Sequence, residues 1–187
     1  GHIMSIAFSP NGRHLVAGGS DNAARVWDVA TGKELQILKG HINWISSMSF
    51  SPDGQYVVSG SWDNTVKLWR VTTGELLLTC VQIHMSDWIV ITPDGRFDGS
   101  PQGMQLMHYA KDNRSISLDA LFDRFYTPNL MAQVLSGEKL AKSQYDMREG
   151  FKSPPLVSIT KPEPGRSFNT QNVEITVRVE NQGGGIQ

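Results

Sequence analysis

Phe50-Ser51-Pro52-Asp53-Gly54 decides the fold, because the pattern Phe8-Ser9-Pro10-Asn11-Gly12 stands 42 positions earlier in the chain. Between positions 8 and 35, 13 of 28 residues are identical at this offset, with no gap. The same shift pairs other polar and aromatic residues, carrying Asp21-Asn22 onto Asp63-Asn64 and Trp27 onto Trp69. A period of this length is typical of repeat architectures in which each unit is one supersecondary structure.

Each unit is predicted to hold four short strands joined by tight turns. In the second unit the strands are expected at residues 42–50, 55–59, 65–71 and 75–81. Apolar and polar residues alternate with period two along them, which favours half-buried strands. Pro52, Asp53 and Gly54 are residue types that suit the tight backbone of the first turn.

Several motifs of the second unit resemble the WD40 repeat, whose units form the blades of a β-propeller. These motifs are Gly40-His41, Ser59-Gly60-Ser61, Asp63 and Leu68-Trp69, and the resemblance covers residues 1–83. It implies a buried network in which His41 binds Asp63 of the tight turn while Ser59 and the Trp69 indole complete the set. A buried carboxylate is tolerable only when donors of this kind surround it.

The resemblance gives Asp21 and Trp27 the corresponding places in the first repeat. Ala17 stands there in place of Ser59, and no histidine aligns without a gap. We therefore expect the network of the first blade to be incomplete.

The rest of the chain departs from the repeat. Residues 84–112 begin like a third unit, with Thr92-Pro93-Asp94-Gly95, but lack the later motifs, so they predict a degenerate third blade with one further strand near 103–110. Residues 113–153 predict a helical segment and linker, with helical faces at 118–125 and from Pro128 to Gly137. Residues 154–187 hold two strands that resemble the start of an immunoglobulin-like sandwich.

The order of these parts resembles bacterial WD40 proteins that also carry a caspase-like cysteine peptidase domain. The middle segment, about residues 84–150, which includes the stretch from Trp88 to Ser100, is the more telling part of that resemblance. It implies that this chain is a fragment of a larger multidomain protein and lacks the peptidase domain.

Residues that could carry chemistry have simpler structural explanations. Cys80 ends an apolar strand, and the residues around it do not resemble the catalytic segment of caspase-like peptidases, so we expect an inert thiol. The stretch from Asp94 to Gly99 fails as a calcium loop because Arg96 stands where an oxygen ligand is required. His41 as a metal ligand is less favoured than its role in the network. The sequence therefore predicts no catalytic residue, no metal site and no cofactor.

Composition restricts the partners. The chain has 187 residues and a formal net charge of −1, which gives no overall attraction to nucleic acid or to an anionic membrane. One cysteine excludes a disulfide within the chain, and no apolar run approaches the length of a membrane span. We expect no nucleic-acid or membrane partner and a cytoplasmic location.

The sequence thus predicts a mainly β fold: a partial WD40 propeller, a short helical segment and an incomplete immunoglobulin-like module. The favoured function is a non-catalytic protein–protein interaction scaffold; the alternative is the regulatory or targeting part of a caspase-like peptidase. The candidate partner surface consists of Trp62, its counterpart Ser20, and Trp44. Two interpretations of Trp62 remain open: it is an exposed contact residue, or it packs on the neighbouring blade. For Trp44, packing in the core or between blades is favoured. Because two or three blades leave apolar faces open, a homo-oligomer that completes the propeller is a further expectation.

Overall fold

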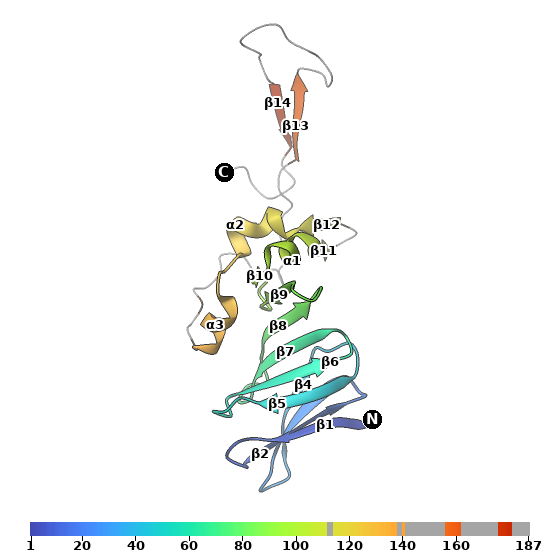
Figure 1. Ribbon diagram of the computed structural model, residues 1–187, viewed down its shortest axis with the longest axis vertical. Coiled ribbons are helices and arrows are strands. Elements are labelled where there is room, and N and C mark those ends of the chain that lie inside the picture. The colour runs from blue at the N-terminus through green and yellow to red at the C-terminus, as the bar shows by residue number, and fades with distance from the viewer. Residues whose placement is uncertain (112–113, 138–139, 141–155, 162–175, 181–187) are drawn as a thin grey trace. The chain divides into compact units, whose positions relative to one another are not determined.

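The computed structural model describes residues 1–111, 114–137, 140, 156–161 and 176–180 (Figure 1). The chain divides into two compact units, residues 1–144 and residues 145–187.

The first repeat folds into one four-stranded antiparallel sheet, with the strands in chain order. Its strands are β1 (Ile3–Phe8), β2 (His14–Gly19), β3 (Ala23–Asp28) and β4 (Glu34–Lys39). The turn between β2 and β3 holds Asn22 at φ 61°, and the matching turn of the second repeat holds Asn64 at φ 62°. Asparagine is among the few residues other than glycine that adopt this left-handed conformation readily, which explains its place in both turns.

The second repeat forms the same four strands within a larger sheet. These are β5 (Ile45–Phe50), β6 (Tyr56–Ser61), β7 (Thr65–Arg70) and β8 (Leu76–Gln82). Two further strands, β9 (Trp88–Ile91) and β10 (Phe97–Gly99), add to the outer edge of β8 and give the order β10-β9-β8-β7-β6-β5. Figure 1 shows this succession of strands from β5 to β10.

This pairing corrects the prediction of a degenerate third blade over residues 84–112. The chain reverses over residues 83–87, where the N–H of Ile83 donates to the carbonyl of Asp87 (2.9 Å). A reversal this short returns the chain along the strand it has just left, so Gln82 pairs with Trp88. Residues 88–99 therefore extend the second sheet.

The two sheets pack face to face, and the main core lies between them. The first sheet contributes Val16, Ala24, Val26 and Leu38, each 0% exposed. The second contributes Ile45, Met48, Val57, Trp69 and Val71. The two sets of residues occupy different positions of the repeat, so opposite faces of the two units pack together, as expected of neighbouring blades.

Short helices follow β10. They are α1 (Pro101–Leu106), the 3₁₀ turn η1 (Leu118–Leu121), α2 (Phe122–Phe125) and α3 (Leu130–Leu135), with the hairpin of β11 (His108–Lys111) and β12 (Arg114–Ser117) after α1. The prediction of a strand over 103–110 is wrong for its first part, because the Ser100 side chain accepts the N–H of Gly103 and Pro101 starts a helix. The helical prediction at 118–125 is confirmed, with Leu118, Leu121 and Phe125 buried. The helix predicted from Pro128 to Gly137 corresponds to α3, which ends before Gly137, where φ is 74°.

In the second unit the structure describes one antiparallel pair, β13 (Leu156–Lys161) and β14 (Thr176–Glu180). Both strands lie within residues 154–187, where the sequence predicts two strands. Most of the predicted linker over 138–153 lies outside the described residues.

Candidate functional site

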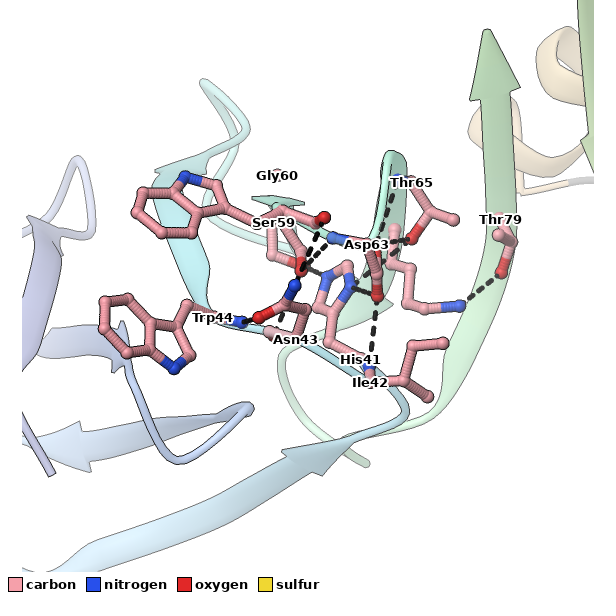
Figure 2. A network of polar contacts seen from close by, with 12 residues as sticks. His41, Ile42, Asn43, Trp44, Ser59, Gly60, Asp63, Thr65 and Thr79 are labelled. Atoms are coloured by element: carbon pink, nitrogen blue, oxygen red, sulfur yellow. Dashed lines mark hydrogen bonds and ion pairs between the residues drawn. The ribbon is translucent and has the colours of Figure 1, made fainter. Parts of the chain in front are cut away.

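A chain of buried hydrogen bonds links four side chains of the second blade, as Figure 2 shows for His41, Ser59 and Asp63. His41 Nδ1 lies 2.7 Å from Asp63 Oδ2, and His41 Nε2 lies 2.8 Å from Ser59 Oγ. The Trp69 indole N–H donates to Ser59 Oγ at 2.8 Å. Because a carboxylate only accepts, the direction runs from Trp69 through Ser59 and His41 to Asp63.

Asp63 receives further donors that the sequence analysis did not identify. The Thr65 hydroxyl donates to Asp63 Oδ1 at 2.6 Å, and the backbone N–H groups of Thr65 and Ile42 donate at 2.9 and 3.1 Å. Burial alone would raise the pKa of Asp63, but the hydrogen bonds from Thr65, His41 and these amides outweigh it and lower the pKa from 3.8 to about 2. The pattern Asp63-x-Thr65 could have indicated this donor from the sequence, because the first repeat has Ala23 in place of Thr65.

Three elements position the network. His41 lies in the connection before β5, Ser59 lies on β6 and Trp69 lies on β7. A Cβ atom on Gly40 would lie 3.2 Å from the Trp69 ring, so glycine lets the chain pass close to the indole. The network therefore ties the incoming connection to two strands of the blade, and its groups are occupied with one another.

The first blade lacks this network. Asp21 forms an ion pair with Arg25, with Oδ2 2.6 Å from Nη1. A cavity of about 300 Å³ is lined by Asp21, Arg25, Ala17 and Trp27 together with the first three residues of the chain. Asp21 and Trp27 thus share a cavity, and no histidine links them.

Trp44 and Trp62 lie together at one end of the second blade. Their rings stack at 5.1 Å between centroids with an interplanar angle of 23°, and Trp44 is 38% exposed and Trp62 56%. The Trp62 N–H donates to the Trp44 carbonyl at 2.9 Å. Asn43, which the sequence analysis missed, links both: its side chain accepts the Trp44 N–H (2.8 Å) and donates to the Trp62 carbonyl (3.4 Å). Figure 2 shows Asn43 and Trp44 beside the network.

The structure does not bring Ser20 into this aromatic pair. Ser20 lies in the corresponding turn of the first blade, where its hydroxyl accepts the backbone N–H of His2 at 2.7 Å. The exposed aromatic surface therefore consists of Trp44 and Trp62, with Ile42 beside them in sequence and 85% exposed.

Cys80 lies half-buried on β8, and burial raises the pKa of its thiol while the nearby Lys67 charge opposes the shift. The Lys67 ammonium donates to the Thr79 hydroxyl at 2.9 Å, and burial lowers its pKa. Within the described part of the chain, no three His, Cys, Asp or Glu side chains gather as a metal site would require. No helix among the described residues is both long and apolar enough to cross a membrane.

Comparison with known proteins places the repeats. Residues 1–28 and 32–70 match the family described as "WD domain, G-beta repeat". An uncharacterized WD repeat-containing protein of Nostoc sp. is 44% identical over 46 residues, which are 25% of this chain and 3% of that protein. The Thermomonospora curvata protein named "Probable serine/threonine-protein kinase PkwA" is 49% identical over 42 residues, 22% of this chain and 6% of that protein.

A eukaryotic relative matches over a stretch of the same size. The general transcriptional corepressor TUP1 of Saccharomyces cerevisiae is 42% identical over 40 residues, 21% of this chain and 6% of that protein. Each match thus spans about one repeat and a small part of a much longer protein. Together with the two packed sheets, these matches show that residues 1–28 and 32–70 of this chain are similar to WD40 repeats.

Proposed function

We propose that this chain is a non-catalytic protein–protein interaction scaffold that binds partners through the stacked pair Trp44–Trp62. The observation that carries the proposal is the exposure of two large aromatic rings side by side at one end of a rigid blade. Tryptophan is enriched among the residues that contribute most to protein–protein binding.

The indoles are held in place before any partner arrives. The hydrogen bonds through Asn43 and between the two backbones fix the loops that carry the rings. The His41–Asp63 network joins the same connection to the blade strands. Preorganised side chains lose little conformational freedom on binding, which favours affinity.

Selection from a displayed peptide library tests this proposal. Peptides that bind the wild-type chain are expected to lose at least tenfold in affinity to Trp62→Ser and to Trp44→Ser. Leu106→Ser is the matched control, because Leu106 is 53% exposed on α1 and is not part of the pair. A library that yields no binder, or binders that both tryptophan variants retain, would overturn the proposal.

Self-association is a second part of the proposal, and the first sheet supports it. Ile3, Ile6 and Phe8 of β1 are 68%, 57% and 61% exposed, and apolar residues gathered in this way on a sheet face favour contact with another protein surface. A homo-oligomer that completes a propeller would cover them. We further propose a cytoplasmic location and no nucleic-acid partner, in line with the net charge of −1.

The alternative is that the chain is the regulatory or targeting part of a bacterial caspase-like cysteine peptidase. Its support is the order of segments: WD40 repeats, the Trp88–Ser100 stretch that forms β9 and β10, and the predicted immunoglobulin-like start that includes β13 and β14. The test is a longer natural chain that contains these residues. Peptide hydrolysis that disappears when one cysteine outside this chain is replaced would support the alternative, and a longer chain without hydrolytic activity would contradict it.

A further inference from the structure

The interface inside the chain shows which surfaces of a blade fit each other. On one side stand residues of the first sheet, and we name this kind of surface face B: Val16, Ala24, Val26 and Leu38. On the other stand residues of the second sheet, named face A: Ile45, Met48, Val57, Trp69 and Val71. Face A of one blade therefore packs on face B of the blade before it.

The 42-residue repeat places the same two faces at the outer sides of the pair. Face A of the first blade consists of Ile3, Ile6, Leu15, Trp27 and Val29, and Ile3 and Ile6 are among the exposed residues. Face B of the second blade consists of Val58, Val66, Leu68 and Cys80. Since these sets correspond to those that meet inside the chain, the first blade of one copy fits the second blade of another.

Face B of the second blade is partly occupied. Leu130 and Val134 of α3, which are 0% and 8% exposed, pack in one cluster with Leu68, Leu78 and Tyr56 of the second sheet. The helix thus lies where a following blade would stand. Val58 of β6 and Val66 of β7 stay 39% and 43% exposed.

The second repeat is apolar at the positions that α3 covers. Tyr56 and Leu78 stand where the first repeat has His14 and Gln36. Gln36 donates instead to the carbonyl of Thr72 at 3.0 Å, in the second blade. Face B therefore carries polar residues at these two positions in the first repeat, where it packs on another blade. It carries apolar residues there in the second repeat, where it packs on α3.

The uncovered part of face B is hollowed. A groove of about 810 Å³ is lined by Gly60, Val66, Cys80 and Trp88, among others. A docking blade would fill this groove only after α3 has moved, because the helix holds the other part of the same face.

We propose that α3 is a cap that keeps face B of the second blade closed to face A of a second copy of this chain. Displacement of the cap opens head-to-tail stacking, in which every copy offers one face and receives the other. Such heterologous contacts close into rings or grow into filaments. The inference rests on the self-association part of the proposed function and states the condition under which it occurs.

Light scattering on the whole chain, from 1 to 100 micromolar, tests the cap. The cap-opening variant is Leu130→Glu with Val134→Glu, and Leu130→Ala is a milder version that adds no charge. The control is Met131→Glu with Leu135→Glu, on the exposed side of the same helix (40% and 47% exposed). We expect the solution mass of the wild type and of the control to stay constant over this concentration range. The solution mass of the cap-opened chains is expected to rise with concentration.

A third substitution distinguishes the proposals. Ile6→Lys places a charge on face A, and added to the cap-opened chain it is expected to return the mass to that of the wild type. A wild type that is already an oligomer, and that Ile6→Lys dissociates, would support self-association but overturn the cap. If the cap-opened chains, Leu130→Ala included, keep the wild-type mass, both self-association and the cap are overturned. Association that persists in the presence of Ile6→Lys would overturn both as well. Peptide binding at Trp44–Trp62 would be unaffected by each of these results.

Discussion

Replacing Ser59 by alanine breaks two buried hydrogen bonds with the loss of a single oxygen atom. Ser59 is 0% exposed, and its hydroxyl links the Trp69 indole N–H to His41 Nε2 at 2.8 Å on each side. Both partners are buried, Trp69 at 1% and His41 at 6% exposed, so we expect that water does not replace the lost hydroxyl. A buried polar group left without a partner costs about 1–3 kcal/mol, so the two together predict a loss of about 2–6 kcal/mol in the free energy of unfolding.

Urea unfolding at pH 7, followed by far-UV circular dichroism, measures this loss. The control is Ser49→Ala, which removes the same atom from an exposed position of β5 and is expected to change the free energy of unfolding by less than about 0.5 kcal/mol. The first repeat already carries alanine at the equivalent position 17, so the backbone of a blade accepts this residue. A Ser59→Ala chain as stable as Ser49→Ala would refute the argument that the network stabilises the blade.

Three further predictions follow from the same region. The pKa of Asp63 is about 2 in the folded chain against 3.8 in the unfolded chain, so its ionised form adds about 2 kcal/mol to the free energy of unfolding. This stabilisation is present above pH 4 and is lost as the pH falls through 3.8 towards 2. Between pH 4 and 2 the free energy of unfolding should therefore fall less steeply with pH in Asp63→Asn than in the wild type. Burial raises the pKa of Cys80, so a disulfide reagent at pH 7.5 should label the folded chain at least tenfold more slowly than the urea-unfolded chain, and equal rates would contradict the buried position. Gly40→Ala puts a Cβ 3.2 Å from the Trp69 ring at φ 155° and should lower the free energy of unfolding by about 1–3 kcal/mol; a melting temperature equal to that of the wild type would be inconsistent with the close approach.

The repeat made the blades predictable from sequence. Turn residues such as Asn64 and the alternation along β7 fix local geometry, and the 42-residue offset supplies the second copy. The roles of His41 and Trp69 were expected from the resemblance to the WD40 repeat, and the need of a buried carboxylate for donors agrees with them. Thr65 and Asn43 were missed, since a threonine or asparagine in a loop has many local uses and only the fold shows which group it reaches.

The region after Gln82 could not be predicted in the same way. Thr92-Pro93-Asp94-Gly95 makes the turn that the repeat motif implies, but pairing depends on the chain before it. The reversal at residues 83–87 directs β9 back along β8, and no local pattern in β9 itself encodes that partner. The contact of α3 with the second sheet is likewise tertiary, although Tyr56 and Leu78 marked it by departing from the first repeat.

The most direct test of the account is amide and indole hydrogen exchange by NMR, read at the tryptophan side chains of one sample. Trp69 is 1% exposed and its indole N–H is bound to Ser59, whereas Trp44 and Trp62 are exposed as the proposed contact surface. The account predicts that the Trp69 indole proton exchanges at least a hundredfold more slowly than those of Trp44 and Trp62. Equal exchange rates of the three indole protons would contradict both the buried network and the exposed pair Trp44–Trp62.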